Sequence, residues 1–287
     1  MSSNIYFKDN NHRSLSWWFA RFFSRLVLLM PPSLSLKIGK KLLLKPIRRK
    51  PTSIPTNISV EKVTTPDGEV ALYKTGTGSV VLLSHGWSGS ASQMFKLMNK
   101  IAESGFQAVA YDQLGHGLSS GDEANLFLFI KTQRFIIDLL QEKQSIQAII
   151  SHSMGSPAAL NALKSSYPLL LIAPVFKFTQ TLYEKVEQSG VAIGLLEKIL
   201  DNLERQHGMK FQRSDSLEFV RDYQGSVHII HDQNDPFTSI TDSKQVAQTF
   251  VHVSLTVTNN LGHSRIINSN ETWNAFSEMM KLSRVAA

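Results

Sequence analysis

A serine stands where a buried strand would turn sharply into a helix. The apolar run 147–150 is typical of a buried strand, and small, helix-forming residues follow from Ser156. Between them, the run SHSMG at 151–155 places small residues two before and two after Ser153, the pattern of a nucleophile elbow. Such a turn projects a weak hydroxyl nucleophile clear of the sheet and aims the next N–H at an oxygen that becomes negative. Ser151 replaces the usual first glycine, so the motif alone is a weak signal.

An acid and a histidine follow later in the chain, each after a predicted strand. Asp235 follows the apolar run 227–230, and His263 is the only one of nine histidines that follows the last predicted strand, 253–257. Asp232 is a competing acid three residues earlier, and the spacing favours Asp235. Serine, acid and histidine in this order are found in one common hydrolase architecture.

The elements that must position these residues alternate along the chain. Strands are predicted at 59–65, 69–74, 80–84, 107–111, 147–150, 167–172, 227–230 and 253–257, with helices at 91–104, 125–143, 242–250 and 265–282. This alternation predicts an α/β fold with a mostly parallel twisted sheet and helices on both faces. Reactive groups then lie at the carboxyl ends of the strands. Two consecutive helices without an intervening strand, 176–190 and 191–207, predict a lid inserted at about 176–225.

Five loop motifs together resemble those of the α/β-hydrolase superfamily over roughly Ile58 to the C-terminus. In chain order they are His85-Gly86-Trp87, the D-x-x-G-H-G-x-S run at 112–119, the Ser153 elbow, the H-x-x-x-D run at 231–235 and Gly262-His263. Each motif is weak alone, and five in the right order and spacing are specific. A serine at the elbow argues against the dehalogenase and epoxide-hydrolase branches, which use aspartate there.

The resemblance implies a role for each matching residue. Ser153 would attack an acyl carbon, His263 would act as general base, and Asp235 would orient and stabilise its imidazole. The N–H groups of Trp87 and Met154 would form the oxyanion hole. The remaining matching residues, which we expect to line the substrate site, are His85, Gly86 and His152. No metal cluster is evident in the sequence and no cofactor is implied.

The first 50 residues differ sharply in charge from the rest. They carry eleven Lys or Arg and one acid, whereas the other 237 carry nineteen Lys or Arg and twenty-two acids. The run 13–30 predicts a basic amphipathic helix with an aromatic apolar face, on which only Trp17 and Leu28 depart from the pattern. Because Arg21 and Arg25 interrupt the apolar residues of this run, we expect it to be neither a membrane span nor a cleaved signal peptide.

Two interpretations of this arm remain open. Residues 13–50 could bind an anionic membrane surface. Alternatively, the helices of this arm could dock on the body of the protein, which starts near Ile58, or cover its active site. Nothing resembles a folded nucleic-acid-binding module, so no nucleic-acid partner is expected. We therefore divide the chain into a basic helical arm and linker, 1–57, and a hydrolase domain, 58–287.

The sequence predicts a serine hydrolase that cleaves a carboxylic ester or thioester through an acyl-enzyme. The apolar residues of the predicted lid favour an apolar acyl group, and the basic arm favours a membrane-associated esterase of the monoacylglycerol or lysophospholipid type. The same triad also serves peptidases, C–C hydrolases and acyltransferases, and a binding protein could retain the fold. We expect a cytoplasmic protein with contact at the inner membrane surface. The sequence leaves the oligomeric state open.

Overall fold

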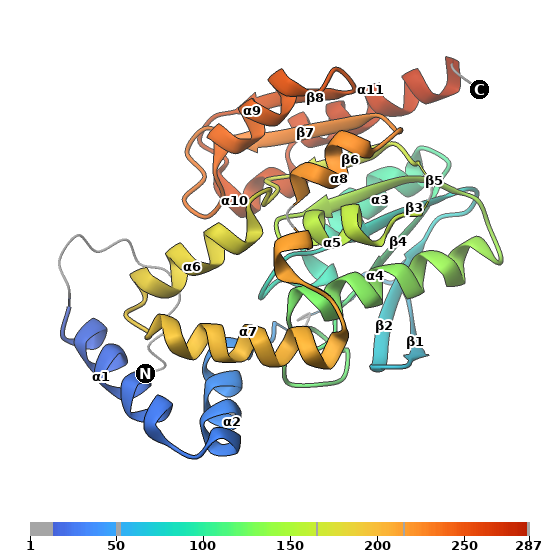
Figure 1. The fold of residues 1–287 in the computed structure, drawn as a ribbon. Coiled ribbons are helices and arrows are strands. Elements are labelled where there is room, and N and C mark those ends of the chain that lie inside the picture. Colours follow the sequence, from blue (N-terminus) through green and yellow to red (C-terminus); the bar gives the residue numbers. More distant parts are fainter. Residues whose placement is uncertain (1–13, 50–52, 165, 215, 286–287) are drawn as a thin grey trace. The chain divides into compact units, whose positions relative to one another are not determined.

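The fold is centred on an eight-stranded sheet with strand order β1-β2-β4-β3-β5-β6-β7-β8 (Figure 1). The structure is a computed structural model that describes residues 14–49, 53–164, 166–214 and 216–285. The last six strands in this order run parallel, whereas β1 and β2 form an antiparallel hairpin at one edge. The strands are β1 Ser59–Thr65, β2 Gly68–Thr75, β3 Val80–Ser84, β4 Gln107–Tyr111, β5 Ile146–His152, β6 Leu169–Ile172, β7 Val227–Asp232 and β8 Val253–Thr258.

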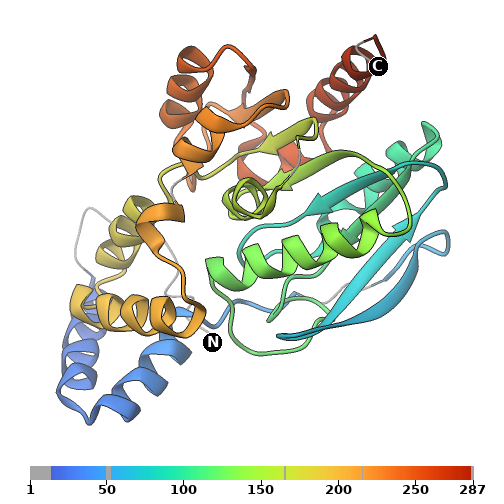
Figure 2. The same ribbon diagram turned by 45° about the vertical axis from the view of Figure 1, so that its right-hand side comes forward.

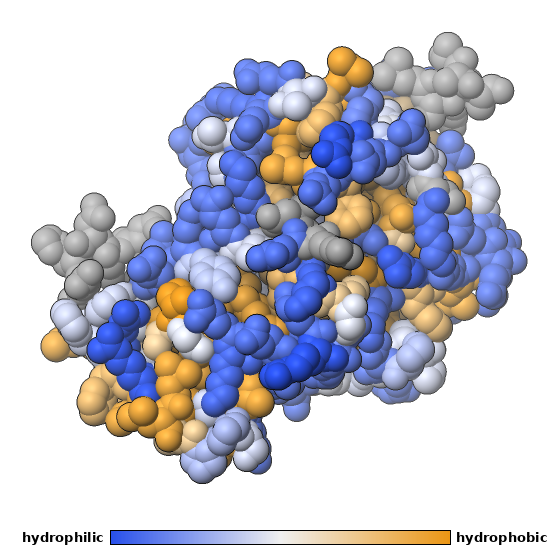
Figure 3. All heavy atoms as spheres, viewed as in Figure 1, coloured by the Kyte–Doolittle hydropathy of each residue, from blue (hydrophilic) through white to orange (hydrophobic). Residues whose placement is uncertain are grey.

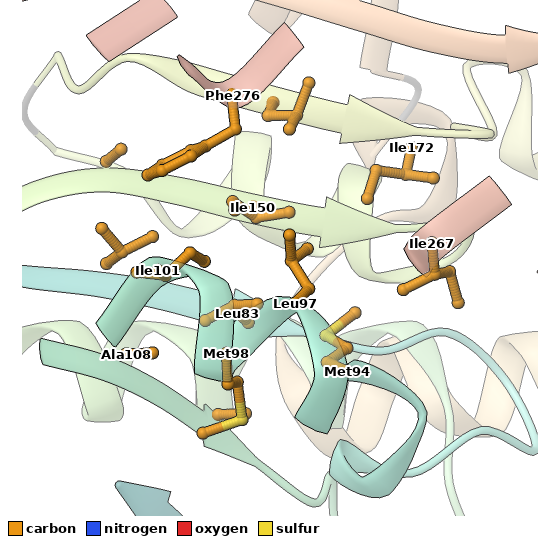
Figure 4. Packing of buried hydrophobic residues seen from close by; sticks show 14 of the residues in the cluster. Leu83, Met94, Leu97, Met98, Ile101, Ala108, Ile150, Ile172, Ile267 and Phe276 are labelled. Atoms are coloured by element: carbon orange, nitrogen blue, oxygen red, sulfur yellow. The ribbon is translucent and has the colours of Figure 1, made fainter. Parts of the chain in front are cut away.

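Helices cover both faces of this sheet, as predicted for the α/β class. α3 (Phe95–Glu103) and α11 (Asn270–Val285) lie on one face, and α4 (Leu126–Gln141) and α5 (Gly155–Ala162) lie on the other (Figures 1 and 2). Their apolar faces and the alternate residues of the strands form the core. In Figure 4, Leu97 of α3 and Phe276 of α11 lie beside Ile150 of β5. The remaining short elements here are η1 Ala91–Met94, α8 Ser216–Asp222, α9 Ile240–Thr249, α10 Gly262–Arg265 and η3 Ile266–Asn268.

The predicted boundaries hold closely in this part of the chain, with one difference at the C-terminal helix. We predicted a single helix over 265–282, whereas the structure has α10, η3 and then α11. The break places Ile266 and Ile267 in the core, where both side chains are fully buried. Thr272 Oγ1 then donates a 2.6 Å hydrogen bond to the Ile266 carbonyl, which satisfies the end of the short turn.

The chain divides into two compact units that differ from the predicted domains. One comprises residues 1–45 and 177–215, and the other residues 46–176 and 216–287. The first unit therefore combines the N-terminal arm with most of the predicted insertion. Its described elements are α1 Leu15–Leu29, α2 Pro32–Leu43, α6 Phe178–Gln188, α7 Ile193–His207 and η2 Phe211–Ser214. Residues 1–13 of the predicted arm and 50–52 of the predicted linker lie outside the described residues.

Small residues hold the arm helices against the insertion helices in the first unit. Ser24 of α1 is fully buried, and its Oγ accepts a 2.8 Å hydrogen bond from the Ala192 N–H at the start of α7. A methyl group at Gly39 of α2 would lie 2.8 Å from Cδ1 of Ile199, so this glycine permits a close approach to α7. These contacts determine which side of α1 and which side of α2 face α7.

Candidate active site

The turn from β5 into α5 carries Ser153 in a left-handed backbone conformation. Its φ is +52°, a region that costs a non-glycine residue roughly 1–2 kcal/mol. The Ser153 N–H donates to the Ile172 carbonyl of β6, and the Ser156 N–H donates to the Ser153 carbonyl, both at 2.9 Å. These bonds hold the strained turn, which is the geometry expected of a nucleophile elbow.

Two glycines let the neighbouring loop approach this turn. A methyl group at Gly155 would lie 2.8 Å from the His85 carbonyl oxygen, and one at Gly86 would lie 2.6 Å from Cβ of Ser153. Contacts this short exclude any side chain at either position. The loop that contains Trp87 therefore packs directly against the elbow.

The serine at the first glycine position of the elbow has a buried partner. Ser151 is paired in register with Ser84 of β3, and their hydroxyl oxygens are 2.9 Å apart. Both residues are fully buried. A hydroxyl in this position is tolerated because the neighbouring strand supplies a hydrogen-bonding partner for it.

Asp235 and His263 meet beyond the carboxyl ends of β7 and β8. Oδ2 of Asp235 lies 2.7 Å from Nδ1 of His263, and the Asp235 side chain has no exposed surface. Burial alone would raise the pKa of this carboxyl, but hydrogen bonds from His231 and His263 outweigh burial and hold it well below its usual range. Asp235 therefore remains a carboxylate and can accept the Nδ1–H of His263.

A second histidine and a threonine also contact Asp235. Thr238 Oγ1 donates to Asp235 Oδ2 at 2.9 Å, and Nε2 of His231 lies 3.5 Å from the same oxygen. Nδ1 of His231 lies 2.7 Å from Oγ of Ser243 on α9. The sequence motif contained His231 without a role for it, and Thr238 was not singled out. Both now emerge as residues that fix the Asp235 carboxylate.

Asp232, the competing acid, braces the loop that precedes His263. Its Oδ2 accepts hydrogen bonds from Thr258 Oγ1 at 2.8 Å and from the Leu261 N–H at 2.9 Å. Although burial alone would raise its pKa, these donors and the Asn234 N–H lower it. Among the described residues, no hydrogen bond of the Asp232 carboxylate involves a histidine, so the geometry favours Asp235 as the partner of His263.

His152 connects the elbow to the histidine loop. Its Nε2 lies 2.9 Å from the His263 carbonyl oxygen, and the two imidazole centroids are 4.6 Å apart. Burial lowers the pKa of His152 to about 3, so the ring is neutral and donates from Nε2. Ser153 follows His152 directly, and the parallel strands place it at the same edge of the sheet as Asp235 and His263.

Two buried histidines brace the loop that carries Trp87. Nε2 of His85 accepts from the Gln113 N–H, and Nε2 of His116 accepts from the Ser88 N–H, both at 3.0 Å. Burial lowers the pKa of His85 to about 4 and that of His116 to about 3. We predicted that His85 lines the substrate site. Because its side chain is fully buried and both ring nitrogens are bonded, we instead assign it a bracing role.

The N–H groups of Trp87 and Met154 both belong to turns beside Ser153. Within the described part of the chain, neither donates a hydrogen bond to another residue. Gly86, which precedes Trp87, is buried against Ser153. This arrangement is compatible with two backbone donors that serve a developing oxyanion. No group of three or more His, Asp or Glu that could hold a metal ion is present among the described residues.

Acidification should destabilise the fold, because three buried histidines are held neutral. His85, His116 and His152 have folded-state pKa values of about 3 to 4, below the ordinary value of 6.5. The unfolded chain therefore binds more protons, and stability present above pH 6.5 is lost as the pH falls towards the folded values. We expect each of these histidines to lower the free energy of unfolding by about 1.4 kcal/mol for each pH unit in this window.

Urea unfolding measured from about pH 7 to about pH 4 tests this expectation. The midpoint should fall steadily while the m-value stays constant. A midpoint that does not change across this range would contradict the neutral, buried state of these histidines.

These features define an α/β hydrolase with a serine at the nucleophile elbow. The family model described as serine aminopeptidase, S33 (Hydrolase_4) matches residues 76–266, about two thirds of the chain. The chain belongs to this family. The expected superfamily and fold class are thereby confirmed, and the protein is a hydrolase of the α/β-hydrolase family.

Solved structures with the same fold cover most of the chain. An esterase from Pyrococcus furiosus matches with a TM-score of 0.65 and 17% identity, over 84% of this chain and 97% of its own. A membrane phospholipase A, described as a bacterial virulence factor, matches with a TM-score of 0.59 and 15% identity, over 92% of this chain and 99% of its own. At these identities the likeness establishes the fold alone.

A curated relative matches a shorter segment. A protein from Caballeronia sordidicola named epoxide hydrolase is 35% identical over 97 residues. The match spans 32% of this chain and 30% of that relative. It is consistent with the superfamily and leaves the reaction of the whole chain open.

Proposed function

We propose that this protein is a serine hydrolase that cleaves a carboxylic ester or thioester through an acyl-enzyme. The observation that carries the proposal is the 2.7 Å contact between Asp235 and His263 at the sheet edge that also bears the left-handed Ser153. A buried acid bonded to Nδ1 of a histidine leaves Nε2 to act as base.

In this mechanism His263 accepts the Ser153 proton as the hydroxyl oxygen bonds to the acyl carbon. The negative oxygen of the tetrahedral intermediate accepts hydrogen bonds from the Trp87 and Met154 N–H groups. His263 then donates its proton to the leaving group, and the acyl group remains on Ser153. A water activated by the same histidine hydrolyses the acyl-enzyme and restores the serine.

An apolar residue beside His263 supports an apolar acyl group. The ring centroids of Phe237 and His263 are 5.2 Å apart, and 45% of the surface of Phe237 is exposed. In the sequence, the apolar residues of the predicted lid favour the same preference. Several of these, including Leu195 and Ile199, are buried, and both lie against Gly39 within their own unit. Phe237 therefore becomes the better support for this preference.

The proposed substrates are monoacylglycerol- or lysophospholipid-like esters. A series of p-nitrophenyl esters from acetate to palmitate, with fluorophosphonate labelling of Ser153, tests the chemistry and sizes the acyl pocket. We expect medium or long chains to be preferred. Absence of both ester cleavage and labelling would overturn the proposal.

A peptidase and an epoxide hydrolase are the alternatives with specific support. The description of the matching family names a serine aminopeptidase, and the C. sordidicola relative is named an epoxide hydrolase. Ser153 at the elbow disfavours the latter, because that branch resembles this one but uses aspartate there. Aminoacyl-p-nitroanilides and styrene oxide, assayed alongside the esters, distinguish the three reactions.

We also propose that the protein binds the inner surface of the membrane from the cytoplasm, and that α1 makes the contact. Ser24 and Val27 of α1 are buried against its own unit, whereas most of its large apolar side chains are exposed. The outward residues, with exposed fractions from 37% to 89%, are Leu15, Trp18, Phe19, Phe22, Phe23, Leu26 and Leu29. Figure 3 shows hydrophobic surface gathered where Figure 1 places α1 and α2.

Basic side chains favour an anionic lipid surface as the occupant of this face. At 100° per residue, Arg21 and Arg25 lie along one edge of the outward face of α1. Two exposed lysines of α2, Lys37 and Lys41, add to the positive charge of the same unit. An aromatic apolar face bordered by cations is typical of a helix that lies in the headgroup region. No helix among the described residues is long and apolar enough to cross a membrane.

Removing two exposed aromatic residues should weaken membrane binding without unfolding the protein. Phe19 and Phe22 are 69% and 64% exposed, so Phe19→Ser combined with Phe22→Ser removes apolar surface from the face alone. We expect partitioning onto vesicles that contain phosphatidylglycerol to fall at least about tenfold. Sedimentation with vesicles measures it, and vesicles of phosphatidylcholine alone should bind less of the unsubstituted protein.

Val251→Ser provides a matched control, because Val251 is a fully exposed apolar residue in the other unit. It should leave vesicle binding unchanged. Equal binding by the Phe19/Phe22 variant and the unsubstituted protein would overturn the membrane proposal. Loss of a dimer in that variant, with no vesicle binding in either protein, would instead make this face an interface between copies.

A further inference from the structure

Residues 46–48, which we call the strap, contact two loops of the proposed active site. The Ile47 N–H donates a 3.0 Å hydrogen bond to Oγ of Ser88. Arg48 donates from Nη1 to the carbonyls of Gly117 and Ser119, at 3.3 and 2.6 Å, and from Nη2 to that of Gly121. The strap precedes the 76–266 segment that the family model matches.

Ser88 lies in the loop 86–90, which we call the oxyanion loop because it carries Trp87. It follows Trp87, one of the two proposed oxyanion donors, and its φ of +54° is left-handed. Such a conformation persists in a non-glycine residue only when its surroundings hold it. His116 holds the Ser88 N–H, and the strap holds its hydroxyl.

Arg48 fixes the strap to the loop 117–121, which is itself part of the site's framework. The Ser119 Oγ donates to the Asp112 carbonyl at 2.6 Å, and the Leu118 N–H donates to Asp112 Oδ2 at 2.8 Å. The other oxygen of this carboxylate accepts from the Ala91 N–H, just beyond the oxyanion loop. A planar guanidinium can donate to several carbonyl oxygens at once. The Arg48 side chain is only 28% exposed.

We propose that the strap positions the oxyanion hole and that Arg48 is its principal positioning residue. Arg48 acts through the loop 117–121 and through Ser88, and it does not touch the substrate. The inference rests on the proposed function, because it assigns Trp87 an oxyanion role. It adds that a segment outside the matched part of the family fold is needed for full transition-state stabilisation.

Arg48→Met in the 287-residue chain removes the guanidinium donors and keeps a long side chain. We expect kcat to fall about tenfold with little change in KM, because an oxyanion donor acts on the transition state rather than on bound substrate. Complete loss of one donor costs roughly 10²–10³. Arg48→Lys, which keeps the charge and some donors, should recover part of the loss.

Arg49→Met is the matched control, because Arg49 is the exposed neighbour and the chemical change is identical. It should leave kcat unchanged. Active sites are counted by fluorophosphonate titration, so that unfolded protein does not register as lost kcat. An unchanged kcat per active site in Arg48→Met would overturn the inference even if the melting temperature fell, and so would an equal loss in Arg49→Met.

Hydrogen exchange tests the same inference without a known substrate. Peptides that cover 86–90 and 113–121 should exchange faster in Arg48→Met than in Arg49→Met. If the unsubstituted protein cleaves no ester, the proposed function fails while this measurement still decides whether the strap holds the loops. Equal exchange in the two variants would show that it does not.

Discussion

Ser153→Ala should reduce kcat/KM for the preferred p-nitrophenyl ester by at least about 10⁴-fold. The nucleophile and its histidine act as a unit, and loss of a serine of this kind removes almost all covalent catalysis. The residual rate would come from binding and from the Trp87 and Met154 donors. Folding should be unaffected, because alanine fits the same turn, although any non-glycine residue keeps the strain of a φ of +52°.

A second serine on the same turn provides the control for this experiment. Ser156 is fully buried, and its Oγ donates a 3.2 Å hydrogen bond to the Ser151 carbonyl. Ser156→Ala should retain activity within a few-fold and lose about 1 kcal/mol of stability. Activity that survives Ser153→Ala and is lost in Ser156→Ala would refute the assignment of the nucleophile.

The sequence predicted where the strands lie along the chain and which loops carry the candidate site residues. In the runs 80–84 and 107–111 only the end residues Ser84 and Gln107 are polar, and a glycine-containing turn or loop precedes and follows each run, so their length and composition leave little ambiguity. The sheet edge that gathers Ser153, Asp235 and His263 then follows from parallel topology. The particular contact between Asp235 and His263 needs the turn geometry of 232–235, which spacing alone cannot supply.

The hydrophobic periodicity of α1 did not predict which of its residues pack on the insertion helices. Hydrophobicity grouped Val27 with the outward aromatic residues, whereas the structure buries Val27 beside Ser24. Trp17, an exception to the predicted pattern, donates from Nε1 to the Glu187 carbonyl of α6. Leu28, the other exception, lies near Gly194 of α7. Close helix packing selects small residues and depends on the partner surface, which the sequence of one helix does not contain.

The two interpretations of the arm were therefore not exclusive. The packed side of α1 contacts the insertion helices and leaves most of its aromatic residues exposed, so the same helix can both pack on the insertion and present a face to lipid.

The contacts of the strap, residues 46–48, were not predicted from the sequence for a related reason. A basic, proline-punctuated segment reads as a linker, and nothing in its composition indicates that Arg48 is matched to three backbone carbonyls.

Asp235→Asn should lower kcat about 10⁴-fold, whereas Asp232→Asn should retain most of the activity. Asparagine at 235 cannot hold His263 in the tautomer that leaves Nε2 free to act as base, and it cannot stabilise the imidazolium. Asparagine at 232 has the same shape as aspartate but only one acceptor oxygen. It therefore cannot accept all the hydrogen bonds that Asn234, Thr258 and Leu261 donate to the Asp232 carboxylate. That loss should cost about 1–3 kcal/mol of stability.

The two substitutions thus separate chemistry from loop bracing, since each changes one buried carboxylate to its amide. Steady-state kinetics per titrated active site and urea unfolding should give opposite rankings: Asp235→Asn mainly lowers kcat, and Asp232→Asn mainly lowers the unfolding midpoint. If Asp232→Asn instead abolished turnover at full stability, Asp232 would be the catalytic acid. The 2.7 Å contact of Asp235 with His263 would then serve only to position the loop.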